Sequence, residues 1–304
     1  MRVAVSGAGG RLGQALVSAL ADAPFTGLAG PTSWRRPDFD LDAPERFAAL
    51  IARDRPEVVV HAAAWTDVDG CARDPETAAR RNGRATGILA EACAAAGIDL
   101  VTISTNEVFD GRRLDGRGYL PTDPTGPINP YGASKLAGEE AAREAFEGAT
   151  SQLAIVRTAW LFGPGEPDFP TKILRAADAA AERGEPLQVT SDEYGTPTYV
   201  ADVAEAVVEL LASGESGGTH HVVNGLFASR ADWARYCVGR AGLEVDVVDV
   251  PASTWRRPST PPRWGVLEPT PLPSGPPLRP WLDAMADYAP VLLRARAAAG
   301  GASR

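Results

Sequence analysis

Cysteine and histidine are scarce in this chain of 304 residues, which contains three of each. Cys71, Cys93 and Cys237 are scattered and form no CxxC pair, so neither a zinc site nor a disulfide framework is supported. A Ser-His-Asp hydrolase would depend on one of the few histidines, and no G-x-S-x-G element accompanies them. The sequence therefore predicts no metal site and gives little basis for hydrolytic chemistry.

Long apolar runs and excess positive charge are also missing. No apolar run reaches the roughly 18 residues that a membrane-spanning helix needs. The formal net charge of -9 argues against a broad affinity for nucleic acid. The chain passes from Met1 directly into the apolar run Arg2–Ser6 without a leader, which predicts a cytoplasmic protein. The length fits one large α/β unit or two lobes.

A glycine-rich turn follows the first predicted strand, with Gly7, Gly10 and Gly13 spaced three apart. Leu12–Ala21 then shows the apolar spacing of a helix, and strand, glycine turn and helix together are typical of a dinucleotide site. Gly7 would permit the tight turn, Gly10 would let the backbone approach a pyrophosphate, and Gly13 would let the helix pack on the strand. The N–H groups of the first helical turn would face the phosphates. We therefore predict cofactor binding here rather than a plain turn.

The second strand is predicted over Phe25–Ala29. A dinucleotide site usually carries an acid at the end of this strand for the ribose 2′-hydroxyl. No acid is present, and Arg35 and Arg36 follow shortly. Guanidinium groups suit a 2′-phosphate, which favours NADPH over NADH, whereas the ordinary alternative is that both arginines lie on a solvated loop.

Two later strands are predicted to end at the same edge of the sheet. Val58–His61 is an unbroken apolar run typical of a buried parallel strand, and three small residues follow it, Ala62, Ala63 and Ala64. Small side chains there would let a cofactor pass close to the backbone. Leu100–Ser104 is the next predicted strand. Thr105 at its end can either bind a ligand or simply cap the strand.

Tyr131 and Lys135 stand four residues apart in a predicted helix, so they share one face. Asn129 and Pro130 precede them as a helix-start signal. A neighbouring lysine cation is expected to lower the tyrosine pKa and ease proton exchange near neutral pH. Alone, such a pair more often lies on a solvated helix face. The predicted glycine turn and strand ends favour a functional role for this pair.

Several motifs together resemble the extended short-chain dehydrogenase/reductases, most closely their dTDP-4-dehydrorhamnose reductase branch. The resemblance covers roughly the whole chain. It rests on Gly7-x-x-Gly10-x-x-Gly13, Ala62-Ala63-Ala64-Trp65-Thr66-x-Val68-Asp69, Ser104-Thr105-x-x-Val108-Phe109-Asp110-Gly111, Pro130-Tyr131-Gly132-x-Ser134-Lys135-x-x-Gly138-Glu139, Arg157-Thr158-x-Trp160 and Tyr194-Gly195-x-Pro197-Thr198.

This resemblance implies a catalytic triad of Thr105, Tyr131 and Lys135. The predicted cofactor contacts are Gly7, Gly10, Arg11, Leu12, Arg35, Arg36, Asp40, Leu41, Ala62, Ala63, Ala64, Asn82, Tyr131 and Lys135. The predicted substrate contacts are Thr105, Asn106, Glu107, Val108, Phe109 and Trp160.

The chain departs from the family pattern at two places. The family usually reads Ser-Thr-Asp-Tyr-Val-Phe after the fourth strand, and here Asn106 and Glu107 replace Asp-Tyr beside the expected substrate sugar. A late Arg-Pro-x-x-Ser-x-Leu segment is degraded to Pro261-Pro262-Arg263-Trp264-Gly265-Val266-Leu267. The first departure bears on which hexose is bound, and the second bears on nucleotide contacts.

The predicted fold is α/β, a Rossmann-type doubly wound parallel sheet with a smaller carboxyl-side α/β substrate lobe. Residues 1–160 are assigned to the dinucleotide-binding domain, to which some later segments return, and residues 161–304 mainly to the substrate lobe and a C-terminal cover.

The predicted reaction is NAD(P)H-dependent reduction of the 4-keto group of a dTDP-4-keto-6-deoxyhexose, with Tyr131 as proton donor and NADPH as the favoured cofactor. The predicted partner is the nucleotide sugar, without nucleic acid or membrane. Dimers occur in the family that the chain resembles, so the resemblance allows a homodimer and leaves the oligomeric state open. The alternatives are an epimerase or dehydratase of the same fold, a non-catalytic regulatory subunit, and a bare NADP-binding scaffold.

Overall fold

Six parallel strands form the central sheet in the order β2-β1-β3-β4-β5-β10. The computed structural model describes residues 1–165 and 167–301, with side chains up to residue 298. The sheet strands are β1 (Val3–Ser6), β2 (Thr32–Trp34), β3 (Val58–His61), β4 (Asp99–Thr105), β5 (Leu153–Thr158) and β10 (Gly218–His221). Because all neighbours pair in parallel, every carboxyl end lies at one edge of the sheet. The predicted doubly wound α/β fold is confirmed.

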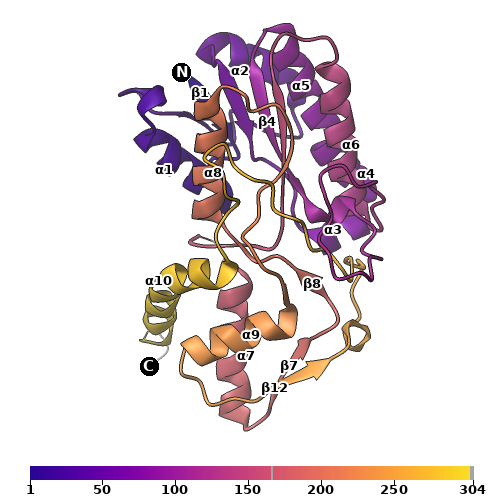
Figure 1. The fold of residues 1–304 in the computed structure, drawn as a ribbon, viewed down its shortest axis with the longest axis vertical. Coiled ribbons are helices and arrows are strands. Elements are labelled where there is room, and N and C mark those ends of the chain that lie inside the picture. Colours follow the sequence, from indigo (N-terminus) through magenta and orange to yellow (C-terminus); the bar gives the residue numbers. More distant parts are fainter. Residues whose placement is uncertain (166, 302–304) are drawn as a thin grey trace.

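Helices cover both faces of this sheet (Figure 1). One face carries α1 (Arg11–Asp22) and α8 (Val200–Ser213), whose leucines and valines pack onto β1, β3, β4 and β5. The other face carries α2 (Phe47–Asp54), α5 (Ala85–Ala95) and α6 (Pro130–Ala145). The side chains under this second layer include Trp34, Phe39 and Phe47, which stack on one another.

A smaller lobe lies below the carboxyl edge of the sheet in Figure 1, with the C-terminus on its last helix. Its helices are α7 (Phe169–Arg183), α9 (Arg230–Arg240) and α10 (Trp281–Gly301). Its short strand pairs are β6 (Leu161–Phe162) with β9 (Thr198–Tyr199), β7 (Leu187–Thr190) with β12 (Val247–Val250), and β8 (Tyr194–Gly195) with β11 (Ala228–Ser229). The boundary near residue 160 stays a prediction, and both α8 and β10 return to the sheet layer after it.

The predicted second strand was wrong. Residues Pro24–Thr26 form a 3-10 turn, and the strand that pairs with β1 is Thr32–Trp34. Gly27 and Gly30 adopt positive φ angles of 65° and 61°, which turn the chain before it can enter the sheet. The correction moves the strand end to Trp34, immediately before Arg35.

The helical region from Pro75 to Ala95 is not uniform. It begins with α4 (Pro75–Ala78), widens into a π-helical segment, Ala79–Arg84, and continues as α5. Segments of this kind are often found at functional sites. The short helix α3 (Val68–Arg73) precedes it. Within the described part of the chain, no helix has both the length and the apolar character required to span a membrane.

Candidate active site

The residues singled out by the sequence gather at the carboxyl edge of the sheet. Gly7 follows β1, Arg35 follows β2, Ala62 follows β3, Thr105 ends β4, and Trp160 lies just after β5. Ligands of open α/β sheets bind outside this edge, where the strand order reverses between β1 and β3. Five strand ends therefore bring distant parts of the sequence to one place.

The glycine turn, residues 7–13, is closed by backbone contacts. A Cβ at Gly13 would lie 2.1 Å from the carbonyl oxygen of Gly7, and a Cβ at Gly7 would lie 2.7 Å from the Ala63 nitrogen. A Cβ on Gly9 would meet nothing within 4 Å. Gly7 and Gly13 are thus required for packing α1 against the ends of β1 and β3, while the outer side of the turn is open.

The open side of the glycine turn fits a phosphate group. Helix α1 starts after Gly10 without a side-chain cap, so the N–H groups of its first turn are not taken by a cap. Arg35 and Arg36 are exposed at the end of β2, and no described residue forms an ion pair with them. This arrangement suits a dinucleotide with a 2′-phosphate, although Asp40, Leu41 and the other predicted contacts stay predictions.

Arg11, another predicted cofactor contact, donates from its Nε to the carbonyl oxygen of Gly163 at 3.1 Å. The loop at Gly163 follows β6 and belongs to the lobe. Tyr288 of α10 donates to the same carbonyl oxygen at 3.1 Å. The start of α1 is therefore joined to the lobe, and Leu12 beside it is buried in the core.

A buried hydrogen-bond chain lies beneath the crevice. The Ser6 hydroxyl donates to Nδ1 of His61 at 2.7 Å, and Nε2 of His61 lies 3.2 Å from the Thr86 hydroxyl. Since that hydroxyl donates to the Asn82 carbonyl at 2.8 Å, it must accept from the imidazole, which places the imidazole proton on Nε2. Burial and the Lys135 cation lower the pKa of His61 to about 3, so the ring is neutral.

The Asn82 amide is fully engaged by the protein. Its oxygen accepts from the Trp65 N–H at 2.8 Å, and its nitrogen donates to the Trp65 carbonyl and the Ser134 hydroxyl, both at 3.0 Å. The Ser134 hydroxyl in turn donates to the Tyr131 carbonyl at 2.7 Å. Asn82 therefore joins the loop after β3 to the first turn of α6, and its predicted cofactor contact stays a prediction.

The first turn of α6 places Tyr131 beside Thr105. Asn129 caps the helix by accepting from the Gly132 N–H at 2.8 Å. A Cβ on Gly132 would lie 2.0 Å from the Glu107 carbonyl oxygen, so the helix start abuts the turn after β4. The Thr105 hydroxyl, which accepts from the Glu107 N–H at 3.2 Å, lies near enough to the Tyr131 phenol to lower its pKa. The structure thus brings together the predicted hydroxyl and phenol.

The expectation that Lys135 lowers the Tyr131 pKa was wrong. Burial raises this pKa, the Glu107 carboxylate raises it further, and only the Thr105 hydroxyl acts in the opposite direction. The Lys135 ammonium is instead turned to the Ile103 carbonyl, at 2.7 Å. Burial lowers the pKa of Lys135 to about 8. The phenol is therefore held in its protonated form.

Trp160 lies in the lobe-facing part of the site in a conformation that side chains rarely adopt, with φ of 43°. A Cβ on Gly195 would lie 2.3 Å from its indole, so the glycine backbone packs on the ring. The Arg230 guanidinium carbon lies 3.6 Å from the ring centroid of Trp160. Sequence reasoning missed Arg230, because it follows a two-residue strand whose pairing only the structure shows.

Four charged residues gather next to the predicted triad, and we call them the charge cluster: Glu107, Glu193, Arg230 and Arg257. Arg230 and Glu193 lie 3.9 Å apart. Burial raises the pKa of both glutamates, and the two arginines oppose that rise. Of these four, only Glu107 was predicted from the sequence.

The C-terminal segment 257–265 passes over this region. Arg257 pairs with Asp69 at 3.4 Å, and Asn129 donates to the Thr260 carbonyl at 3.2 Å. Asn106, a predicted substrate contact, donates to the Gly265 carbonyl at 2.9 Å and so anchors the segment. Two other predicted substrate contacts, Val108 and Phe109, are fully buried in a hydrophobic cluster and support the turn from beneath.

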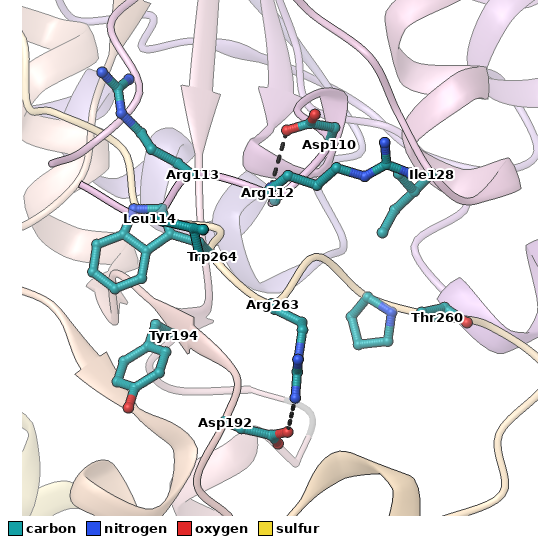
Figure 2. A pocket seen from close by; sticks show the side chains of 12 residues that line it. Asp110, Arg112, Arg113, Leu114, Ile128, Asp192, Tyr194, Thr260, Arg263 and Trp264 are labelled. Carbon is teal, nitrogen blue, oxygen red and sulfur yellow. Dashed lines mark hydrogen bonds and ion pairs between the residues drawn. The ribbon is translucent and has the colours of Figure 1, made fainter. Parts of the chain in front are cut away.

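A groove of about 780 Å³ lies along this segment, and its lining side chains are drawn in Figure 2. Tyr194 and Trp264 form an aromatic wall, and the Arg263 guanidinium pairs with Asp192. The groove is lined by Asp110, Gly111, Arg112, Arg113, Leu114, Ile128, Asp192, Tyr194, Thr260, Pro261, Arg263 and Trp264. None of the three predicted catalytic residues lines it, so it borders the candidate site without containing the chemistry.

Comparison with known proteins finds similar chains among the dTDP-sugar reductases. The chain is 35% identical to dTDP-4-dehydrorhamnose reductase of Mycobacterium tuberculosis over 297 residues, which cover 94% of this chain and 91% of the relative. It is 35% identical to dTDP-4-keto-6-deoxy-D-glucose reductase of Streptomyces niveus over 230 residues, covering 75% and 74%. The crystal structure of dTDP-4-dehydrorhamnose reductase from Bacillus anthracis in complex with NADP superposes with a TM-score of 0.84 at 28% identity, covering 94% and 98%.

The family described as the RmlD substrate binding domain matches residues 1–292. That match spans the sheet, the lobe and most of α10. This chain therefore belongs to the RmlD substrate binding domain family.

Proposed function

We propose that the protein is an NADPH-dependent reductase of the 4-keto group of a nucleotide-activated 6-deoxyhexose of the dTDP-4-keto-6-deoxyhexose type. The observation that carries this proposal is the meeting of the glycine turn, Arg35, and the Thr105–Tyr131 pair at one edge of the sheet. Relatives with dTDP-sugar reductase names at 35% identity support the substrate class. The NADP bound to the Bacillus anthracis reductase supports the cofactor.

The residue roles follow from the site geometry. NADPH, when bound, supplies the hydride that adds to the carbonyl carbon. Tyr131 gives its proton to the carbonyl oxygen as negative charge develops there, and its raised pKa keeps that proton available. Thr105 orients the same oxygen by hydrogen bonding. Lys135 holds the nicotinamide ribose from the next turn of α6.

Net consumption of NADPH separates this proposal from its alternatives. Purified protein is given NADPH and a panel of nucleotide keto-sugars, and both NADPH oxidation and product are followed. An epimerase or dehydratase returns the hydride and gives no net oxidation, and a regulatory or scaffold protein binds NADPH without turnover. Either result would overturn the proposal.

Tyr131→Phe tests the proton donor. We expect reduction to fall by about three orders of magnitude, because a positioned acid contributes roughly 10²–10⁴-fold, while NADPH affinity stays within twofold. Loss of NADPH binding in this variant would show that the tyrosine is structural. The matched change Tyr236→Phe, on α9, should leave the rate unchanged.

We also propose that the protein forms a homodimer and is located in the cytoplasm. The resemblance to the family supports the first, and the sequence composition agrees with the second. Sedimentation of the purified chain tests the oligomeric state: a monomer at micromolar concentration would contradict the dimer.

A further inference from the structure

Glu107 stands at the junction of three elements. Its backbone carbonyl lies against the first turn of α6, where a Cβ on Gly132 would approach it to 2.0 Å. Its Oε2 accepts from the Asn129 amide at 2.6 Å. Asn129 caps α6 and also donates to the Thr260 carbonyl of the C-terminal segment. The Glu107 side chain is thus fixed to the start of the helix that carries Tyr131.

The other carboxylate oxygen of Glu107 has no such partner. Among the described residues, Oε1 makes no hydrogen bond, and it is not one of the completely buried oxygens that lack a partner. It therefore keeps a small exposed area, although burial raises the pKa of the carboxyl group. Three charged side chains influence the pKa of this carboxyl group: Arg230 from α9 and Arg257 from the C-terminal segment lower it, and Glu193 before β8 raises it. The Glu107 charge also raises the pKa of Cys71 on α3 and the pKa of Tyr131. A fixed, partly open acceptor therefore lies beside the phenol that is proposed to meet the reacting carbonyl.

We propose that Glu107 is the specificity-determining residue of this chain, whose free carboxylate oxygen accepts a hydrogen bond from a sugar hydroxyl next to the reacting carbonyl. The inference rests on the proposed reductase function and narrows the substrate class to keto-sugars that keep this hydroxyl. It concerns one of the two positions at which the chain departs from the family pattern. A site that hydrogen-bonds a substrate hydroxyl rejects the analogue lacking it, because the buried acceptor is then left unpaired.

The same carboxylate gives the proposal a second readout. A negative charge beside Tyr131 disfavours phenolate, so removing the charge lowers the Tyr131 pKa. Since the proton donor must be protonated, the alkaline limb of the kcat profile moves to lower pH when Glu107 is neutralised. This limb reports how close the charge lies to the phenol, whereas the comparison of KM between two substrates reports the contact with the sugar hydroxyl.

The test compares wild type and Glu107→Gln on two substrates, a nucleotide 4-keto-sugar with the neighbouring hydroxyl and its deoxy analogue. For the hydroxyl substrate we expect KM to rise about tenfold in the variant, the effect of one charge-assisted hydrogen bond. For the deoxy analogue KM stays within twofold, and the alkaline limb moves to lower pH. Glu140→Gln, on the exposed face of α6, is the matched control and should leave every value unchanged.

Equal KM changes on both substrates, or none, would overturn the Glu107 assignment while leaving the reductase function standing. If wild type oxidises no NADPH with any keto-sugar, both fall together. If Glu107→Gln does not fold, Glu107→Asp replaces it, because the shorter carboxylate cannot make both contacts. This second variant should lose the preference for the hydroxyl substrate and keep the alkaline limb; an unchanged preference overturns the assignment.

Discussion

The two sides of the candidate site are built in different ways. The cofactor side is made of backbone, since the glycine turn is closed by contacts from Gly7 and Gly13 to neighbouring main chain. The substrate side is made of side chains, because the charge cluster joins residues between 107 and 257 in the sequence. The first is a local motif that tolerates little change, and the second depends on tertiary packing and can be altered to select a substrate.

The largest effect is expected where the backbone is tightest. In Gly13→Ala the new Cβ would lie 2.1 Å from the Gly7 oxygen, so α1 must shift away from the strand ends. We expect a loss of about 2–3 kcal/mol in the free energy of unfolding, as for overpacked cores, together with weaker NADPH binding. Gly9→Ala, which meets nothing within 4 Å, is the control for thermal unfolding and cofactor titration. If the two variants have the same thermal stability and the same NADPH affinity, the cofactor side does not depend on close backbone contacts at Gly13.

The buried chain under the cofactor side predicts a dependence of stability on pH. The His61 pKa is about 3 in the folded protein, against the ordinary value of 6.5. The unfolded chain thus binds more protons between these values, and stability is lost as pH falls from about 6.5 towards 3. We expect wild type to lose on the order of 2 kcal/mol more than His61→Asn between pH 6.5 and 4.5.

Urea unfolding of both proteins at several pH values measures this difference. His220→Asn, on β10, serves as the control for replacing a histidine outside this hydrogen-bond chain. Parallel curves for wild type and His61→Asn would show that the imidazole is not held neutral by the fold.

On the substrate side, Arg230→Lys should weaken substrate binding more than cofactor binding. Lysine keeps the charge but loses the planar group that lies 3.6 Å from the Trp160 ring centroid. We expect KM for the nucleotide sugar to rise about tenfold, with KM for NADPH nearly unchanged. Arg235→Lys, exposed on the same helix, is the control in steady-state kinetics. A rise in KM for NADPH alone would show that Arg230 acts on the cofactor side and not on the substrate side.

An effect of the same size, on the choice of cofactor, is expected at the outer end of the cofactor side. Replacing Arg35 and Arg36 together by alanine removes the two cations that follow β2. We expect the preference for NADPH over NADH to fall by about tenfold, since one charge-assisted contact contributes roughly that factor. Arg46→Ala, exposed near the start of α2, is the control. If both cofactors weaken equally, the arginines do not bind the 2′-phosphate.

Prediction from the sequence succeeded where chemistry is encoded locally. The turn at Gly7, the strand Val58–His61 and the helix start at Asn129 are each recognisable from a few adjacent residues, and the structure has each of them. It failed at the second strand, because Gly27 and Gly30 turn a short apolar run out of the sheet. The direction of the Tyr131 pKa was also wrong, since helical spacing alone shows neither burial nor the neighbouring Glu107.

The amino-acid sequence by itself determined the order of strands and helices, the glycine turn, and the helix that carries Tyr131 and Lys135. These depend on backbone freedom and on spacing within a few residues. Only the tertiary structure decided that Arg230 and Glu193 reach Glu107, and that His61 is neutral. Charges and burial depend on what lies nearby in space, and residues more than a hundred positions apart meet only after the lobe packs against the sheet edge.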